Sequence, residues 1–270
     1  SLIRCLACFF VSSALAQDFT IVARLPSPEG EVRVVDLPTD PRIRFLLSGR
    51  SIIGARFLGE EFAGATPFVN FAIHRAAAHL VPRPTSMLQL GLGAGTVPSY
   101  FEDMGITTDI VELSSQVAEC AKNYFQFNTS GFMHGRLHVT DARSLLFVHH
   151  ERHAYSVVVH DLFTGYNPWS LMTFEVFKRI QEAWLAPGGV LVVNIVGWST
   201  YSSDDDGIRE ASGLTWALLD TLRAVFKYAR VFREMPSSMW QDQPTNLVYF
   251  ASDSEVHFDL PVSPKGAPEP

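Results

Sequence analysis

The stretch Leu90-Gly91-Leu92-Gly93-Ala94-Gly95-Thr96 follows the apolar run Met87-Leu88-Gln89-Leu90, which is typical of a buried strand, and leads into a predicted helix. Glycine lets the backbone turn sharply and approach a ligand closely, because no Cβ atom stands in the way. The first turn of the helix leaves N–H groups that can bind a polar ligand. Gly91, Gly93 and Gly95 are therefore predicted to bind a nucleotide. The alternative is a tight turn that holds no ligand.

Two acidic residues at the ends of the next strands favour the nucleotide. Glu112 closes the following predicted strand, about 20 residues after the first glycine, where a carboxylate accepts hydrogen bonds from both ribose hydroxyls. Asp141 ends the third strand, at the edge where ligands bind, and is predicted with Ala142 to contact the adenine. Both carboxylates have structural alternatives. Glu112 also fits the start of a helix, and Asp141 fits the N-cap of a helix that begins at Ala142.

Strands and helices alternate through the rest of the chain. Strands are predicted at 109–112, 137–139, 155–160 and 190–196, and helices at 115–125, 142–149, 173–184 and 213–226. Such alternation predicts a parallel sheet with helices on both faces. Two last strands, near 229–233 and 246–251, are joined by a polar loop and are expected to add an antiparallel edge.

The residues before the glycine loop predict a small antiparallel sheet. The runs 19–23 and 31–35 are rich in strand-forming residues, and 43–53 has the pattern of a hairpin that turns at 48–50. A helix is predicted over 67–80. The expected organisation is a signal peptide or the end of a membrane segment at 1–16, a β annex at 17–66, a nucleotide-binding domain at 67–260 and a Pro-rich disordered tail at 261–270.

Composition narrows the function classes. The 270 residues are 47% hydrophobic and 18% charged, which is ordinary for a globular protein, and the net charge of −7 argues against nucleic acid as a partner. An acidic balance fits a cationic substrate such as a polyamine. His149, His150 and His153 lack the spacing of metal ligands, so no metal is predicted. Beyond residue 16 the only cysteine is Cys120, which we interpret as a buried structural thiol.

The first 16 residues have the pattern of a secretory signal. A short basic start is followed by the apolar run 5–11 and by a small-x-small ending at Ala16, which predicts a protein of the secretory pathway. The chain begins with Ser rather than Met, so the same residues also fit the end of a membrane helix that starts upstream. The run itself is shorter than the roughly 20 apolar residues that span a bilayer. Without a signal, the cytoplasm would be expected.

The order of Gly91–Gly95, Glu112, Asp141, Asp161 and a Pro187-Gly188-Gly189 turn before an apolar strand is similar to that in class I S-adenosylmethionine-dependent methyltransferases. Within that superfamily, residues 46–250 resemble a divergent branch of the spermidine/spermine synthase family, the polyamine aminopropyltransferases. The similarity is carried by 88–96, 111–113, 139–143, 155–165, 171–177, 232–234 and 245–248. It implies a Rossmann-like fold with a mostly parallel seven-stranded sheet, helices on both faces and a small N-terminal antiparallel β annex.

The resemblance also implies an activity. The family transfers an aminopropyl group from decarboxylated S-adenosylmethionine to an amine in polyamine biosynthesis, and Asp161 would bind and deprotonate that amine. Thr164, Tyr166 and Trp169 follow Asp161 and are predicted to line the substrate side. The implied co-substrate is decarboxylated or ordinary S-adenosylmethionine, and the implied partner is a small amine. In this branch the domain is often joined to transmembrane segments, which implies membrane association upstream. A homodimer is left open.

Two departures from the family pattern leave other functions open. The family carries a second aspartate where Thr164 stands, and a threonine cannot act as a base at neutral pH. The family's second ribose-side acid is replaced by Ser114. A methyltransferase that acts on a protein or small molecule needs no paired aspartates, so it is the first alternative. The second is a non-catalytic nucleotide-binding domain, which the missing acid favours.

Overall fold

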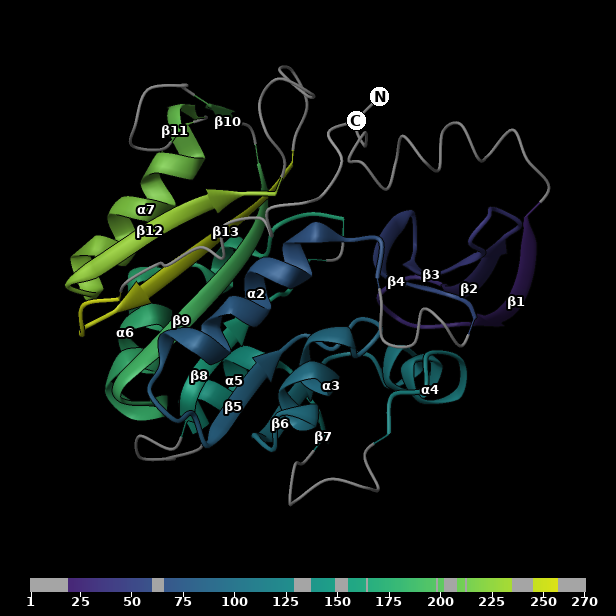
Figure 1. Cartoon of the computed structure of the whole chain (residues 1–270), viewed down its shortest axis with the longest axis horizontal. Helices are drawn as coiled ribbons and strands as arrows, with labels where there is room; N and C mark the ends of the chain where they lie inside the picture. The colour runs from purple at the N-terminus through teal and green to yellow at the C-terminus, as the bar shows by residue number, and fades with distance from the viewer. Residues whose placement is uncertain are drawn as a thin grey trace, which may run out of the picture.

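The computed structural model describes residues 19–59, 66–128, 137–148, 155–163, 165–197, 199–201, 208–211, 213–234 and 245–256. The predicted signal (1–16), the predicted tail (261–270), Thr164 and the histidines of 149–153 lie outside the described residues. Figure 1 shows a large sheet flanked by helices, with a smaller sheet beside it. Among the helices described, none has the length and apolar character needed to cross a membrane.

The large sheet has seven strands in the order β12-β13-β9-β8-β5-β6-β7. Their bounds are β5 (Ser86–Leu90), β6 (Thr107–Glu112), β7 (Leu137–Val139), β8 (Tyr155–His160), β9 (Leu185–Gly197), β12 (Tyr228–Arg233) and β13 (Thr245–Ser252). The strands from β7 to β9 run parallel, and β13 is antiparallel to both its neighbours. The order reverses between β5 and β8, and ligands bind at the carboxyl ends of strands beside such a point. The predicted sheet and its antiparallel edge are confirmed.

Helices cover both faces of this sheet, as predicted (Figure 1). One face carries α2 (Val69–Leu80), α3 (Thr96–Asp103) and α4 (Ser115–Tyr124), and the other carries α5 (Ala142–Val148), α6 (Phe174–Arg179) with the π-helical turn η3 (Ile180–Trp184), and α7 (Gly213–Val225). Neighbours along a strand point to opposite faces. Met87 therefore packs against α2 and α3, while Leu88 packs in the cluster that includes α5, α6 and α7.

Two details differ from the predicted elements. Strand β9 begins at Leu185 instead of residue 190, so the Pro187-Gly188-Gly189 segment lies inside the strand. The pairing of β8 with β9 shifts register opposite this segment, and Gly189 lies so close to two backbone carbonyls that a Cβ atom would approach them to 2.9 Å. The segment is therefore a bulge in the strand, and position 189 within it has room only for glycine. The antiparallel pair β10 (Ser199–Tyr201) and β11 (Ile208–Ala211) was not predicted.

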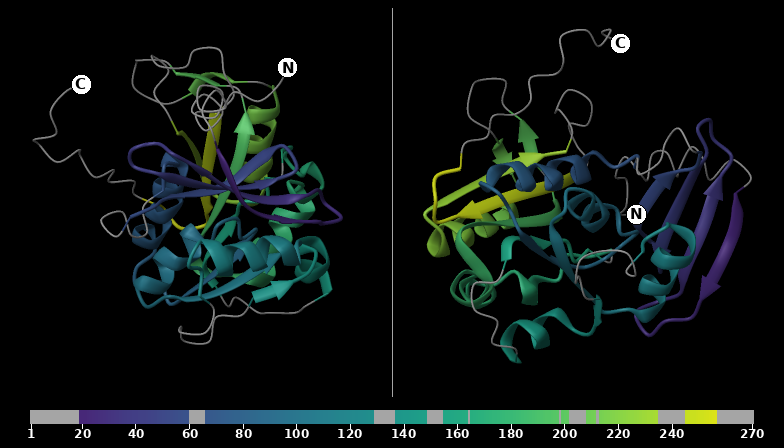
Figure 2. Two further views of the ribbon diagram at one scale, coloured as in Figure 1. Left: turned by 90° about the vertical axis from the view of Figure 1, so that its right-hand side faces the viewer. Right: turned by 60° about the horizontal axis from the view of Figure 1, so that its bottom comes forward.

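The smaller sheet is the predicted antiparallel β annex. Its strands β1 (Thr20–Leu25), β2 (Val32–Leu37), β3 (Ile43–Ser48) and β4 (Ser51–Phe57) are connected in sequence order. The expected hairpin is present, because β3 and β4 pair through to Ser48 and Ser51 around the Gly49-Arg50 turn. Figure 2 shows this twisted sheet standing beside the larger one.

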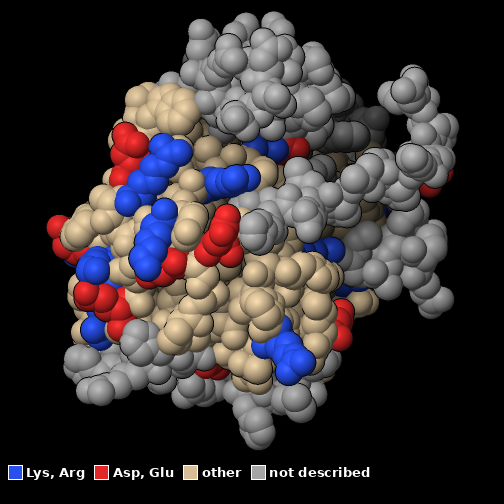
Figure 3. Space-filling view, turned by 60° about the vertical axis from the view of Figure 1, so that its left-hand side comes forward, with Lys and Arg blue, Asp and Glu red and all other residues tan. Residues whose placement is uncertain are grey.

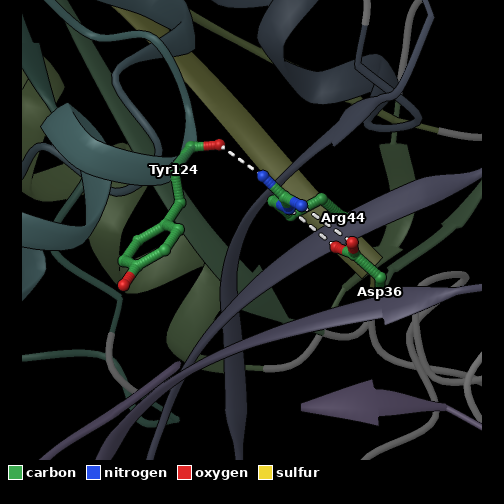
Figure 4. Close-up of polar contacts among 3 residues, drawn as sticks. All are labelled: Asp36, Arg44 and Tyr124. Carbon is green, nitrogen blue, oxygen red and sulfur yellow. Dashed lines mark hydrogen bonds and ion pairs between the residues drawn. The ribbon is translucent and has the colours of Figure 1, made fainter. Parts of the chain in front are cut away.

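Two arginines attach the annex to α4. The guanidinium of Arg44 donates from Nε and Nη2 to both carboxylate oxygens of Asp36 (2.6 and 2.7 Å), and from Nη1 to the carbonyl of Tyr124 (3.1 Å; Figure 4). Arg56 donates to the carbonyl of Phe125 (2.7 Å). These carbonyls end α4, where a helix carries partial negative charge. The hydrogen bond and charge of Asp36 raise the pKa of Arg44, so the guanidinium group stays protonated. The annex is thereby fixed beside the glycine loop.

Candidate active site

A cavity of about 390 Å³ lies at the carboxyl edge of the large sheet and is partly walled by the β3–β4 hairpin of the annex. It has two halves with different walls. The glycine-loop half is formed by Gly91–Ala94, Glu112–Ser114 and Thr140–Ala142. The amide half is formed by Phe68, Phe71, Gln89, Asn194 and Asn246. Asp161 is hydrogen-bonded on both sides, to the backbone of Leu90 before the glycine loop and to the side chain of Asn194.

Gly91 and Gly93 are required by their backbone conformation and by close neighbours in the fold. Gly91 and Gly93 have φ of +87° and +56°. A Cβ atom on Gly91 would lie 2.2 Å from the carbonyl oxygen of Asp161, and one on Gly93 would lie 2.5 Å from that of Ile53 in the annex. Gly95 is the N-cap of α3 and is not a lining residue; its close neighbour is the Phe127 ring. The loop is thus held by β8 and the annex, and nucleotide binding by these glycines stays a prediction.

Glu112 ties the glycine loop to the start of α4. Its Oε2 accepts the backbone N–H of Leu92, and its Oε1 accepts that of Ser114, both at 2.9 Å. Burial raises the pKa of Glu112, and these hydrogen bonds oppose the rise. The backbone of Leu113 also hydrogen-bonds to this carboxylate. The structural alternative is therefore present, and three backbone donors still leave one of the roughly four acceptor positions of a carboxylate for a ribose hydroxyl. Ser114, which replaces the family's second acid, caps α4 by accepting the N–H of Val117 (3.3 Å).

Asp141 also accepts hydrogen bonds from the first turn of the helix that follows it. Its Oδ1 accepts the N–H of Ser144 (2.7 Å) and its carbonyl accepts that of Leu145 (3.0 Å), so it caps α5 as the alternative interpretation held. Asp141 and Ala142 both line the cavity. Their position is compatible with the predicted contact to an adenine, which stays a prediction.

Asp161 is placed between the two halves by the end of β8. Its backbone N–H donates to the carbonyl of Leu90 (2.9 Å), which holds it against the glycine loop. Its Oδ1 accepts a hydrogen bond from Nδ2 of Asn194 (2.9 Å), and its side chain is 16% exposed. The carboxylate is therefore fixed in orientation and reaches the cavity.

The amide half depends on residues that sequence reasoning missed. Gln89 and Asn194 stand near the carboxyl ends of β5 and β9, and Asn246 stands at the amino end of the antiparallel strand β13. The nearest residues on the same face of these strands are apolar. Asn194 also donates to Asn246 (3.3 Å), which in turn donates to Glu234. Among the described residues, Oε1 of Gln89 and Oδ1 of Asn194 have no hydrogen-bond partner. Buried acceptors without donors are rare and costly, which indicates that a ligand supplies N–H or O–H groups.

His74, on α2, also faces Asp161. Its ring is fully buried, and Nδ1 lies 3.9 Å from Oδ2 of the carboxylate. Neither ring nitrogen has a hydrogen-bond partner among the described residues. Burial lowers the pKa of His74 and the charge of Asp161 opposes the decrease. Sequence reasoning missed this residue because nothing in the helix pattern of 67–80 separates it from a core position.

Of the predicted substrate residues after Asp161, one lines the cavity, one does not, and one lies outside the described residues. Tyr166 lines the cavity and is 70% exposed. Trp169 begins the short helix η2 (Trp169–Leu171), is 42% exposed and is not a lining residue, so a substrate contact there stays a prediction. Thr164 lies outside the described residues. Asn167 lines the cavity and fixes this segment by exchanging hydrogen bonds with the backbone of Val196 (2.8 and 3.1 Å).

Metal-ligating, nucleophilic and charged side chains elsewhere among the described residues could mark a further site. Within the described ranges, no three His, Cys, Asp or Glu side chains gather as metal ligands. Burial raises the pKa of Cys120 to about 11, so its thiol is a poor nucleophile. On the face seen in Figure 3, basic and acidic side chains are intermixed. Surface ion pairs join Lys178 to Glu182 and Arg223 to Asp220.

No family model matches the chain, but individual proteins do. An N-terminal histidine N-methyltransferase of Emericella nidulans is 29% identical over 265 residues, which cover 90% of this chain and 44% of that protein. A polyamine aminopropyltransferase of Vibrio vulnificus is 36% identical over 136 residues, which cover 47% of this chain and 42% of that protein. The chain thus spans less than half the length of each curated relative.

Solved structures share the fold. A probable spermidine synthase from Corynebacterium glutamicum has a TM-score of 0.70 at 21% identity, covering 88% of this chain and 82% of its own. A spermidine synthase in complex with the transition state analogue AdoDATO has a TM-score of 0.57 at 17% identity, covering 87% and 72%. The predicted resemblance is confirmed: the chain has the class I methyltransferase-like fold in the form that spermidine synthases have.

Proposed function

We propose that the cavity binds an S-adenosyl sulfonium compound and transfers one of its carbon groups to a nitrogen atom of an acceptor. The observation that carries the proposal is the carboxylate of Asp161, which is fixed between the glycine-loop half and the amide half. Both curated relatives are transferases by name, one an N-methyltransferase and one an aminopropyltransferase.

The glycine-loop half is the proposed donor site. Gly91 and Gly93 leave the backbone open to the cavity, Glu112 has an acceptor position left for the ribose, and Asp141 and Ala142 line the part assigned to the adenine. When bound, the donor supplies an electrophilic carbon attached to a sulfonium. Because the positive charge on sulfur disappears in the reaction, the protein has to orient the reactants more than to stabilise new charge.

The amide half is the proposed acceptor site. A nitrogen must be unprotonated to attack carbon, so a carboxylate that binds the N–H and takes its proton accelerates the reaction. Asp161 fills this role while Asn194 holds its Oδ1. The unpaired oxygens of Gln89 and Asn194 would accept further N–H groups of the acceptor.

Methyl transfer to a peptide nitrogen is the first candidate. The histidine N-methyltransferase matches 90% of the chain, and the aminopropyltransferase matches 47%. Among the described lining residues, Asp161 is the single carboxylate on the acceptor side: Glu112 and Asp141 belong to the glycine-loop half, and Glu29 acts on Glu112 by raising its pKa. One carboxylate suits an acceptor with one reacting nitrogen, such as the N-terminal histidine for which the relative is named.

Aminopropyl transfer to a small amine is the second candidate. It is favoured by the polyamine aminopropyltransferase relative and by a fold shared with spermidine synthases. The donor would then be decarboxylated S-adenosylmethionine, and the acceptor a diamine. A diamine has two ammonium groups, and the described part of the amide half offers a carboxylate to only one of them.

The test is a pair of transfer assays on the purified chain. Ordinary S-adenosylmethionine with a peptide that begins with histidine, and decarboxylated S-adenosylmethionine with putrescine, are each followed by mass spectrometry. We expect one methyl group on the peptide and none on a matched peptide that begins with phenylalanine. Aminopropyl transfer to putrescine alone would select the second candidate. Binding of either donor without transfer would favour a non-catalytic domain, and binding of neither would reject the proposal.

A further inference from the structure

His74 is a polar residue at a buried position where it makes no hydrogen bond among the described residues. It is fully buried on α2 beside Phe71, and its two ring nitrogens lack hydrogen bonds within the described part of the chain. The other fully buried histidine, His160, has its Nε2 3.0 Å from the carbonyl of Leu171. A buried polar group without a hydrogen bond destabilises the fold, which an apolar side chain of similar size would avoid. The presence of a histidine here therefore calls for an explanation beyond packing.

The neighbour that explains it is Asp161. Nδ1 of His74 lies 3.9 Å from Oδ2 of Asp161, beyond the roughly 3.2 Å limit of a good N···O hydrogen bond. A carboxylate oxygen and an unprotonated ring nitrogen are both acceptors, so they have no reason to approach more closely. Once Oδ2 carries a proton it becomes a donor. An approach of about 1 Å would then form an O–H···N hydrogen bond.

We infer that His74 is a positioning residue that receives, through Asp161, the proton released by the acceptor nitrogen. The inference rests on the proposed function, because it requires Asp161 to be the group that deprotonates the acceptor. It goes further because it names a final proton acceptor, His74, which is not among the residues that line the cavity.

The transfer balances without any additional reactant. An N–H bond of the acceptor breaks and its proton goes to Oδ2 of Asp161. The O–H bond then breaks as the proton moves to Nδ1 of His74, and Asp161 regains its charge. The nitrogen lone pair forms the new N–C bond, while the C–S bond breaks and its electrons stay on sulfur. The imidazolium remains beside the carboxylate, which stabilises it until the proton leaves after the products.

The surroundings of His74 suit this use. Helix α2 packs against α3, β8, β9 and β13. On the face of β9 and β13 that meets α2, the polar residues near the site are the uncharged Asn194 and Asn246. The other titratable groups on α2 and α3 are Arg75, His79, Tyr100, Glu102 and Asp103. Arg75 lies over the ring of Tyr100 and His79 contacts its hydroxyl, so both side chains are directed toward α3. Burial keeps His74 neutral at rest, and Asp161 favours its protonation.

The kinetic test compares wild type with His74→Asn and His74→Phe. Turnover of S-adenosylmethionine with the histidine-initiated peptide is measured from about pH 6 to 9, around the ordinary pKa values of imidazole and amino groups. At low pH we expect kcat to fall about 10- to 100-fold in both variants, with acceptor KM and donor Kd within about twofold. The deficit should shrink as the acceptor nitrogen loses its proton unaided. His79→Asn, the other histidine of α2, is the matched control and should retain wild-type kinetics.

A second measurement separates this inference from the proposed function. The ring resonances of His74 are titrated by NMR in wild type and in Asp161→Asn, and thermal unfolding checks that each variant folds. We expect the His74 ring to titrate at a lower pH in Asp161→Asn, because the supporting charge is gone. An unchanged titration, a deficit independent of pH, or full activity in His74→Asn would each overturn the relay. Absence of transfer by the wild type would instead reject the proposed function, while the NMR result still tests the pair.

Discussion

The two halves of the cavity satisfy their polar groups in opposite ways. In the glycine-loop half, Glu112 and Asp141 accept backbone N–H groups from Leu92, Ser114 and Ser144 at 2.7–2.9 Å. In the amide half, acceptor atoms of Gln89 and Asn194 have no partner in the described part of the chain, and the same holds for both ring nitrogens of His74, which lies next to Asp161 outside the cavity wall. The acidic side chains of the glycine-loop half have hydrogen-bond partners without a ligand, whereas two acceptors of the amide half have none among the described residues.

This difference indicates how specificity can change on a constant fold. The glycine-loop half is built from backbone, so a substitution of most side chains there leaves its shape intact. The amide half is built from side chains of α2, β5, β9 and β13, and exchange of one of them alters the hydrogen bonds offered to the acceptor. Relatives with different transferred groups, a methyl in one and an aminopropyl in the other by name, fit such a division.

The largest effect is expected where the halves meet. Asp161→Asn keeps an oxygen that accepts the hydrogen bond of Asn194 but cannot take a proton. We therefore expect the transfer rate to fall about 100- to 10,000-fold, while donor Kd stays within about twofold. Rates are measured by mass spectrometry and donor binding by calorimetry.

The matched control for this loss is Asp220→Asn. Asp220 is an exposed carboxylate on α7, 3.9 Å from Arg223, and its replacement should leave both measurements unchanged. If Asp161→Asn weakened donor binding as much as turnover, the carboxylate would belong to the glycine-loop half, and the division proposed between the halves would be wrong.

An intermediate effect is expected in the glycine-loop half. Gly93→Ala would place a Cβ atom 2.5 Å from the carbonyl oxygen of Ile53 and strain a φ of +56°. Because the backbone forms this site, we expect donor Kd to rise about tenfold or more and stability to fall by about 1–3 kcal/mol. Gly105→Ala is the matched control, since its φ of +77° is similarly strained but no atom lies within 4 Å of the new Cβ. Equal donor affinity in the two variants would show that the loop does not form the donor site.

The glycine-loop half and the fold could be predicted because their determinants are local. Apolar periods located the strands and helices to within a few residues, and Glu112 and Asp141 were found from their places after strands. Local patterns also explain the errors. Pro187-Gly188-Gly189 has the composition of a turn, and only the pairing of β8 with β9 shows that it is a bulge within a strand.

The amide half could not be predicted because its determinants are distant in sequence. Gln89, Asn194 and Asn246 each interrupt an apolar strand, but that they share a face depends on the strand order and register. His74 reaches Asp161 only because α2 lies across the ends of those strands. A polar residue near one end of an otherwise apolar strand was the signal available, and it was not used.

The smallest effect is expected in the amide half itself. Gln89→Met keeps the volume and removes the oxygen that lacks a partner among the described residues. If that oxygen accepts an N–H of the acceptor, acceptor KM rises up to about tenfold, the value of one hydrogen bond, with donor Kd unchanged. The resting protein should gain stability, because a buried acceptor is gone. Met87→Leu, on the same face two residues earlier, controls for packing. A stable Gln89→Met variant with wild-type KM would mean that the unpaired oxygen is a defect of the apolar face, and that only Asp161 and Asn194 meet the acceptor.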